Sequence, residues 1–314
     1  MSPATTRPAR RLLPVFGVLL LLAPLASCAG EETETAGTTP PELTRLFAVD
    51  SLRSPESVAW DSARSRYLIT NIAGEPSAED GNGFVTAVSP SGDSVQRRAM
   101  TSGSLGAVLD APKGIDVRGD RAWIADLHTV VGVDLRADTA VFELTIPESR
   151  FLNDVAVGHD GAVYVSDSRG DAVYRVDPAG EAWSRHGAAG SLSGANGLHA
   201  DPAGPGLLVA GWEGAVLRLD PDSSVTLLAD PLDAENLDGI QPAGEDRILY
   251  SDFGRGTLHA LHRRRPGHWE PSPPWLEGLT TPADFLRRDA LLAVPELQAG
   301  RVVFYRIAER EGAP

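Results

Sequence analysis

Four oxygen-bearing side chains recur at matching places along the chain and could together bind a metal ion. They are Glu56, Asn153, Asn196 and Asp238, and each stands just before a short apolar run. Carboxylate and amide oxygens are hard ligands, and two carboxylates balance the charge of a divalent cation. The set contains neither Cys nor His. It therefore predicts one divalent ion, with Ca²⁺ favoured and Mg²⁺, Mn²⁺ or Zn²⁺ as alternatives.

Lys113 stands at the same place in a further copy of the pattern and is the only lysine among 28 basic residues. A compact ammonium with a tunable pKa suits the orientation of a substrate oxygen or the stabilisation of a developing anion. Two other interpretations remain open. Lys113 could neutralise the carboxylates without a metal, and Asn-Asp, Asn-Gly and Asp-Gly pairs are common in turns.

These residues belong to a seven-residue pattern that recurs six times. Its copies are PESVAWD from Pro55, APKGIDV from Ala111, FLNDVAV from Phe151, GANGLHA from Gly194, NLDGIQP from Asn236 and TPADFLR from Thr281. The position before each apolar run holds Glu56, Lys113, Asn153, Asn196, Asp238 and Ala283, at successive spacings of 57, 40, 43, 42 and 45 residues. An insertion at 75–83 explains the long first spacing.

Each copy continues as several short runs of β-branched and aromatic residues bounded by Gly, Asp and Ser, which is typical of strands. Units of about 40–45 residues with about four strands each are typical of propeller blades. The sequence therefore predicts an all-β fold, a single six-bladed β-propeller with four-stranded blades over residues 43–308. The sixth copy ends after three strands at 301–306, so we expect an N-terminal strand at 46–49 to complete the last blade and close the ring.

In a propeller the first strand of each blade lines the central axis, so the six pattern positions should meet at one mouth of the channel. The turns after the second strands face the same mouth and supply its predicted substrate-binding rim: Asn71, Asp126, His128, Asp167, Arg169, Trp212, Glu213, Asp252, Arg255 and Glu296. His128 is the candidate for a second general base, and Arg169 and Arg255 could bind an anionic group. The 75–83 insertion is predicted to act as a lid, and its Asp80 and Asn82 are further predicted substrate-binding residues.

The N-terminus has the composition of an export signal. Three arginines precede an apolar stretch at 12–26, which is shorter than the roughly 20 residues of a bilayer span. The residues Leu25-Ala26-Ser27-Cys28 resemble a bacterial lipobox. They predict a signal peptide at 1–27, a lipidated Cys28 with a flexible tether over 28–42, and a short tail at 309–314. The alternative is an ordinary signal peptide with an incidental cysteine.

The overall charge limits the partners. With 43 acidic against 28 basic residues, the formal net charge is -15, which argues against nucleic acid and against a polybasic membrane-binding face. The single cysteine excludes an intrachain disulfide framework and a zinc ribbon. We therefore expect an exported monomer, anchored to the bacterial cell envelope on its periplasmic or outer-surface side through its lipid alone, that meets small molecules.

The repeat residues also carry a family resemblance. Pro55 to Asp61, Asn153-Asp154, Asn196-Gly197-Leu198 and Asp238-Gly239, at blade spacing, resemble the regucalcin and gluconolactonase (sugar lactone lactonase) family of six-bladed propellers. The resemblance covers about Leu43 to Ile307. It implies a central divalent metal held by Glu56, Asn196 and Asp238, with Asn153 as a further ligand or substrate contact. Lys113 departs from the family pattern at its position.

The resemblance implies a metal-dependent hydrolase that opens a lactone or related ester, with Asp238 as general base or nucleophile. The expected catalytic set is Asp238, Lys113 and His128, and the expected substrate is a small lactone or ester, sugar-derived in that family. A non-catalytic propeller resembling NHL-repeat binding modules is the alternative, because the fold alone does not decide function. The ring of oxygen ligands favours the enzyme, since a scaffold needs no such convergence.

Overall fold

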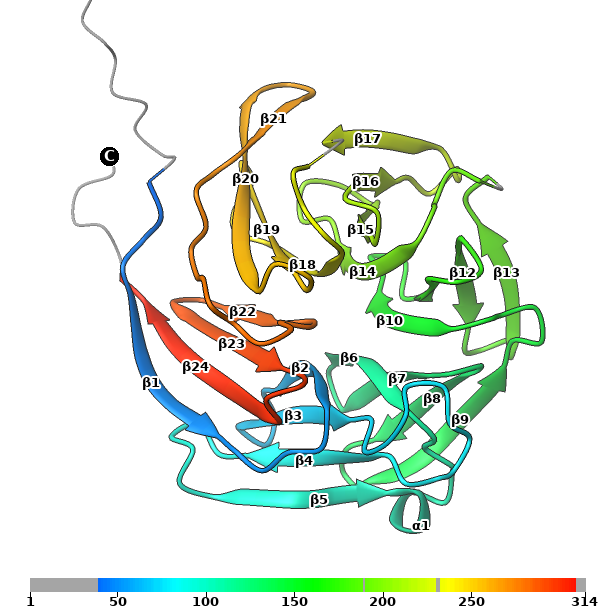
Figure 1. Cartoon of the computed structure of the whole chain (residues 1–314). Helices are drawn as coiled ribbons and strands as arrows, with labels where there is room; N and C mark the ends of the chain where they lie inside the picture. Colours follow the sequence, from blue (N-terminus) through cyan, green and yellow to red (C-terminus); the bar gives the residue numbers. More distant parts are fainter. Residues whose placement is uncertain (1–38, 189, 230–231, 309–314) are drawn as a thin grey trace, which may run out of the picture. The chain divides into compact units, whose positions relative to one another are not determined.

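The computed structural model describes residues 39–188, 190–229 and 232–308. The predicted signal peptide, Cys28, most of the tether and the C-terminal tail lie outside the described residues. Within them, six antiparallel four-stranded sheets form the ring of a six-bladed β-propeller (Figure 1). The predicted fold class is therefore confirmed.

The first three blades are consecutive meanders. Blade 1 contains β2 (Pro55–Asp61), β3 (Arg66–Asn71), β4 (Phe84–Val88) and β5 (Val95–Thr101). Blade 2 contains β6 (Pro112–Arg118), β7 (Arg121–Asp126), β8 (Thr129–Asp134) and β9 (Thr139–Thr145). Blade 3 contains β10 (Leu152–Val157), β11 (Val163–Asp167), β12 (Ala172–Asp177) and β13 (Ala182–His186).

Blades 4 and 5 repeat this order, and blade 6 takes one strand from the N-terminal side. Blade 4 contains β14 (Ala195–Ala200), β15 (Leu207–Gly211), β16 (Val216–Leu219) and β17 (Val225–Ala229). Blade 5 contains β18 (Leu237–Pro242), β19 (Arg247–Asp252), β20 (Thr257–Arg265) and β21 (His268–Pro271). Blade 6 contains β22 (Leu286–Arg288), β23 (Leu291–Glu296) and β24 (Arg301–Ile307), with β1 (Leu43–Val49) beside β24.

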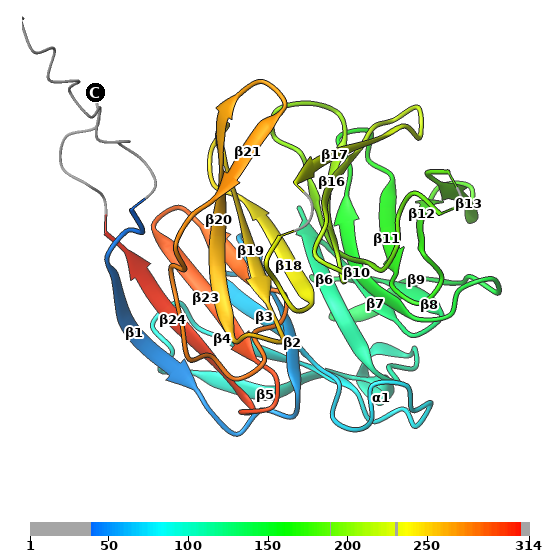
Figure 2. The same ribbon diagram turned by 45° about the horizontal axis from the view of Figure 1, so that its top comes forward.

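The hydrophobic core lies between the blades rather than inside one of them. Neighbouring sheets face one another around the ring (Figure 2). Strand residues alternate between the two faces of each sheet, so apolar side chains on both faces can pack against the adjacent blades. In the described residues, a separate buried apolar cluster fills each of the six interfaces between adjacent blades. The only helix there, α1 (Ser102–Leu105), has four residues, and no helix in that part is long and apolar enough to cross a membrane.

The inner strands of blades 1 to 5 all carry a β-bulge at the repeat pattern. In blade 1 the pairing of β2 with β3 shifts between Pro55 and Val58, so that Glu56 and Ser57 together face one partner residue. The same shift occurs in β6, β10, β14 and β18. A bulge locally breaks the alternation of side chains. It therefore turns the polar residue of each copy toward the axis while the rest of the strand keeps its apolar packing.

Close approach of the inner strands explains why glycine follows the polar residue in three copies. A Cβ added at Gly197 would lie 2.2 Å from the backbone oxygen of Asp238, and one added at Gly114 would lie 2.6 Å from the Cα of Asp154. Neither backbone atom can move away as a side chain could. The Gly of Asn-Gly and Lys-Gly is thus a packing requirement of the axis.

Buried hydrogen bonds join neighbouring blades around the same axis. The hydroxyls of Thr70, Ser166 and Ser251 donate to the carbonyl oxygens of Lys113 (2.5 Å), Asn196 (2.6 Å) and Ala283 (3.0 Å) in the next blade. The Ser57 hydroxyl donates to Asp284 Oδ2 (2.5 Å), which joins blade 1 to blade 6. These bonds fix the inner strands relative to one another, and with them the residues that face the channel.

Candidate functional site

A cavity of about 420 Å³ opens at the axis where the bulged residues meet. Glu56, Lys113, Asn153 and Asp238 line it, and each is buried, with at most 8% of its surface exposed. Asn196 is fully buried; its amide nitrogen donates to the carbonyl oxygen of Leu237 (3.2 Å). The structure thus brings three predicted metal ligands together with Lys113 at one cavity and holds the fourth, Asn196, at the equivalent place in its blade.

Two oxygen atoms of this set have no hydrogen-bond partner. They are Oε2 of Glu56 and Oδ1 of Asn196, and both are buried. An unsatisfied buried acceptor costs on the order of 1–3 kcal/mol, so such atoms are rare unless something else binds them. Both atoms belong to residues that the sequence predicts as metal ligands.

The carboxylates around the axis repel one another. Burial raises the pKa of Glu56 well above its usual range, and the neighbouring Asp238, Asp284 and Asp154 raise it further. Burial also raises the pKa of Asp238, with Asp284 adding to the effect. Each carboxyl is less costly when neutral or when a positive charge lies close by.

Lys113 supplies one such charge. Burial lowers the pKa of its ammonium to about 8, although Glu56 and Asp126 act in the opposite direction. Its Nζ donates to the carbonyl oxygen of Ala111 (3.0 Å) and lies 4.2 Å from the ring centroid of Phe151. One ammonium does not balance several ionised carboxylates, so any carboxyl groups that lose their protons in excess of it leave negative charge at the axis.

The donor set fits a hard divalent cation. Glu56 and Asp238 offer carboxylate oxygens, and Asn153 and Asn196 offer amide oxygens, which are the ligand types that Ca²⁺ and Mg²⁺ prefer. Among the described residues, no three His, Cys, Asp or Glu side chains come together as a metal site on their own. Any ion at the axis would therefore depend on the two asparagines as well as on the two acids.

Five predicted rim residues have a different position from the one expected. Asn71, Asp126, Asp167, Asp252 and Glu296 end the second strand of their blades, are buried, and do not line the axial cavity. Their side chains accept hydrogen bonds from backbone N–H groups just before the inner strand: Arg53 (3.1 Å), Asp110 and Ala111 (2.7 and 2.6 Å), Arg150 and Phe151 (2.8 Å each), Glu235 (3.0 Å) and Thr280 (2.9 Å). These hydrogen bonds hold the segment that leads to the inner strand. The side-chain oxygens of the five residues are therefore not directed at a substrate in the cavity.

Other predicted site residues also lie apart from the cavity. His128 lines a different hollow, where its Nδ1 is 3.0 Å from the Ser149 hydroxyl, so it is not placed as a second base beside Asp238. Arg255 pairs with the exposed Asp233 (2.5 Å). Asp80 and Asn82 bond to each other (2.6 Å) at the surface. Glu213 is exposed and accepts a long hydrogen bond from Ser193 (3.4 Å).

Two predicted rim residues and part of the insertion do reach the cavity. Trp212 and Arg169 line it, and so does Pro76 of the 75–83 insertion. The Arg169 guanidinium lies 4.1 Å from the ring centroid of Phe151 and donates to the hydroxyl of Ser77 (3.2 Å). The insertion thus contacts the rim at its first residues, 76 and 77, while its acidic part points elsewhere.

Apart from Trp212, the apolar wall of the cavity was not predicted from the sequence. Much of the wall comes from one repeat position, the residue directly after the second strand, which holds Ile72, Leu127, Ser168, Trp212, Phe253 and Leu297. Of these six, all except Leu127 line the cavity. The period that revealed the polar ring would also have revealed this wall, had the next residue been followed from blade to blade.

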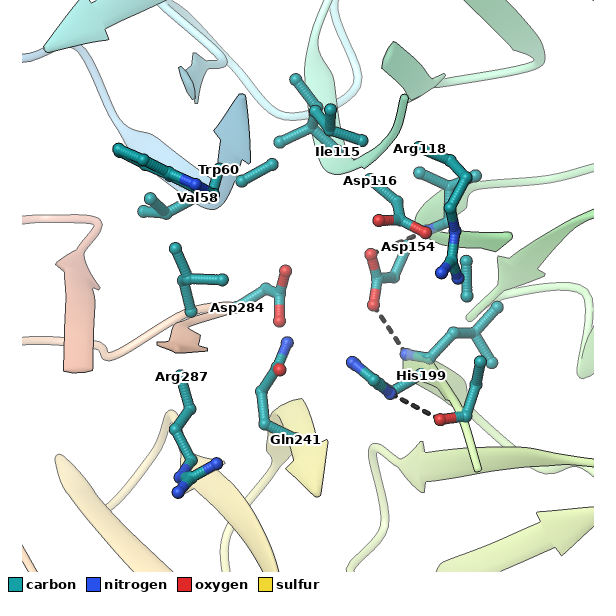
Figure 3. Close-up of a pocket in the computed structure, with 17 residues that line it drawn as sticks. Val58, Trp60, Ile115, Asp116, Arg118, Asp154, His199, Gln241, Asp284 and Arg287 are labelled. Carbon is teal, nitrogen blue, oxygen red and sulfur yellow. Dashed lines mark hydrogen bonds between the residues drawn. The ribbon is translucent and has the colours of Figure 1, made fainter. Parts of the chain in front are cut away.

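A second cavity, of about 250 Å³, lies further along the inner strands. Figure 3 shows Asp154 and Asp284, neither of which was predicted as a site residue, projecting into it from opposite sides. Asp154 accepts from the backbone N–H groups of Val155 (2.7 Å) and Leu198 (2.6 Å). Asp284, whose pKa burial and Asp116 raise to about 7, accepts from Ser57. These carboxylates already join neighbouring strands, which accounts for their presence.

No protein-family profile and no curated protein sequence matches the chain. Its fold is similar to that of virginiamycin B lyase from Staphylococcus aureus, with a TM-score of 0.60 and 11% identity over 85% of this chain and 100% of that chain. A protein described as a candidate gluconolactonase has a TM-score of 0.60 and 16% identity over 87% and 93%. A nidogen/laminin complex has 0.59 and 15% over 73% and 88%. At these identities the similarity shows a shared propeller fold, which proteins with quite different names possess.

Proposed function

We propose that this chain is a hydrolase that opens a lactone or related ester at a divalent cation, Ca²⁺ in the first instance, held by Glu56, Asn153, Asn196 and Asp238. The observation that carries the proposal is the pair of buried oxygens without partners, Glu56 Oε2 and Asn196 Oδ1. Hard oxygen donors, crowded carboxylates and an adjoining cavity of substrate size support it.

A cation bound there would supply Lewis acidity, which polarises an ester carbonyl and lowers the pKa of a nearby water. Asp238, at the cavity, would accept the proton of the attacking water at its carboxylate. Its raised pKa means that this ionised form depends on positive charge close by. The Lys113 ammonium would stabilise the negative charge that develops on the substrate oxygen, in surroundings from which water is largely excluded.

The predicted export is a separate part of the proposal. A lipid on Cys28 would place the propeller at the cell envelope, where we expect it to meet small molecules. The monomeric state stays a prediction as well.

Turnover by the purified full-length chain tests the proposed activity. We expect hydrolysis of at least one lactone or ester from a broad panel, a loss of 100-fold or more in kcat for Asp238→Ala, and a loss of about tenfold or more for Lys113→Met. Asp222 is exposed in the turn between β16 and β17. The substitution Asp222→Ala therefore provides the matched control. A folded native protein that turns over no ester would favour the non-catalytic binding propeller instead.

A further inference from the structure

The wall of the axial cavity is apolar on most of its circumference. Ile72, Pro76, Phe151, Trp212, Phe253 and Leu297 line it from five of the six blades. Ile72 and Phe151 belong to a packed apolar cluster that Leu297 adjoins. Trp212 and Phe253 form a tilted aromatic pair, with ring centroids 5.6 Å apart. Trp212, Phe253 and Leu297 are half-buried, so part of their surface remains free toward the cavity.

Most of the polar side chains that line the cavity are grouped at the candidate cation site, apart from the apolar wall. Glu56, Asn153 and Asp238 belong to the candidate cation site, and Lys113 lies beside them. Beyond these, the lining side chains that carry polar atoms are Ser168, Arg169, Gln298 and Trp212, the last through its indole N–H alone. The acids expected on the rim are turned to backbone amides, as Asp126 and Asp167 illustrate. A polyhydroxylated ring would therefore leave several hydroxyls without partners, and each unpaired buried hydroxyl opposes binding.

We infer that the substrate is a lactone or ester with an apolar body of alkyl or aryl type, seated against Trp212, Phe253 and Leu297, and not a polyhydroxylated sugar lactone. The reacting carbonyl would lie at the polar floor and the apolar body against the wall. This inference rests on the proposed function for the reaction itself, while the choice of ligand rests on the wall alone.

A homologous series of lactones measures the preference directly. The probes are γ-butyrolactone, γ-hexalactone and γ-nonalactone, compared with D-glucono-δ-lactone. Burying one further methylene is worth about a fourfold change in an equilibrium, so kcat/KM should rise by roughly that factor per carbon until the wall is covered. Glucono-δ-lactone should be the poorest substrate of the four.

Single substitutions in the wall test which residues cause the preference for longer alkyl chains. Trp212→Ala should lower kcat/KM for γ-nonalactone by a larger factor than kcat/KM for γ-butyrolactone, and so flatten the dependence on chain length. Trp269, a half-buried indole on the outer strand β21, provides the matched control, and Trp269→Ala should keep the native dependence. If Trp212→Ala does not fold, Phe253→Ala removes the other member of the aromatic pair and should have the same effect.

A binding measurement separates failure of this inference from failure of the proposed function. The 5-alkyl-2-pyrrolidinones match the alkyl lactones in shape and resist hydrolysis, and calorimetry gives their affinity. Tighter binding with each added carbon supports the apolar ligand even if no ester is turned over, in which case only the hydrolase proposal fails. Equal affinity along the series, or faster turnover of glucono-δ-lactone than of γ-nonalactone, would overturn the inference and leave the hydrolase in place.

Discussion

At the scale of single residues, the axis keeps groups that a purely structural core would not. Glu56, Asp238 and Lys113 are nearly fully buried, and two acceptor oxygens there lack partners. Replacing such groups by apolar residues is often neutral or stabilising. Elsewhere in the described residues the buried acids Asp126 and Asp167 accept backbone hydrogen bonds. The unpartnered oxygens at the axis are the residue-scale basis of the proposed cation site.

His262 gives a residue-scale prediction for the pH dependence of stability. It is buried on β20 without a partner for Nε2, opposite Arg247 on β19 and Glu270 on β21. Burial, with Arg247 and Arg264, lowers its pKa to about 4. The unfolded chain, with a His pKa near 6.5, binds the proton more readily. The stability that His262 contributes as a neutral group is therefore present above about pH 6.5 and is lost as the pH falls toward 4.

The measurement is urea unfolding at several pH values for His262→Gln. The variant should lose less of its unfolding free energy between pH 6.5 and 4 than the native chain. The exposed His268 on the next strand provides the control, and His268→Gln should keep the native slope. Identical slopes for the native chain and His262→Gln would contradict the assignment.

At the scale of elements, two recurring structural features position the residues of the site. The bulge in the inner strands of blades 1 to 5 turns a polar residue inward, and in every blade except blade 4 the acid or amide that ends the second strand holds the segment before the inner strand. Both features recur in most blades, so the geometry of the site follows from the repeat. The loops contribute most of the apolar lining of the cavity, mainly through residues that follow the second strand, such as Trp212 and Phe253.

Ser166 tests whether the bonds between blades hold the inner strands. Its hydroxyl donates to the carbonyl of Asn196 and accepts from the N–H of Asp154 (2.8 Å). Ser166→Ala would leave two buried backbone groups unpaired, so we expect the unfolding free energy to fall by about 1–3 kcal/mol. Ser184→Ala, on the exposed face of β13, should change it by less than about 0.5 kcal/mol. Equal stability of the two variants in urea would show that the bond contributes little.

The sequence predicted the fold and the axial ring because both follow a period. Six copies of one pattern specify six blades, and their equivalent positions must converge on the axis. The prediction from the sequence failed where the direction of a side chain depends on the bulge and on partners that are distant in the chain. Asp126 and Asp252 share the period but face backbone amides, and His128 faces Ser149. Asp284 was overlooked because Ala283 interrupts the polar position in the sixth copy.

At the scale of the whole molecule, the ring distributes the core over six interfaces, and β1 lies in the sixth sheet beside β24. That this strand closes the ring stays a prediction. Phe47 of β1 stacks on Phe304 of β24, with ring centroids 4.3 Å apart. If β1 closes the ring, contacts such as this one join the N-terminal strand to the C-terminal strand.

Truncating Phe47 measures the contribution of β1. Phe47 is half-buried, so Phe47→Ala should lower the unfolding free energy by about 2–3 kcal/mol, somewhat less than a full core aromatic. Its neighbour Leu46 is exposed, and Leu46→Ala should cost well under 1 kcal/mol. A Phe47→Ala variant as stable as Leu46→Ala would mean that the sixth blade does not depend on this strand.

The central claim, a cation on the propeller axis, has one direct measurement. It is elemental analysis of the purified full-length chain after extensive dialysis, for the native protein and for Asp238→Ala, with Asp222→Ala as control. We predict about one divalent ion per chain in the native protein and the control, and none in Asp238→Ala. A native protein that is folded and carries no divalent ion would contradict the claim and leave Lys113 as the charge that balances the axial carboxylates.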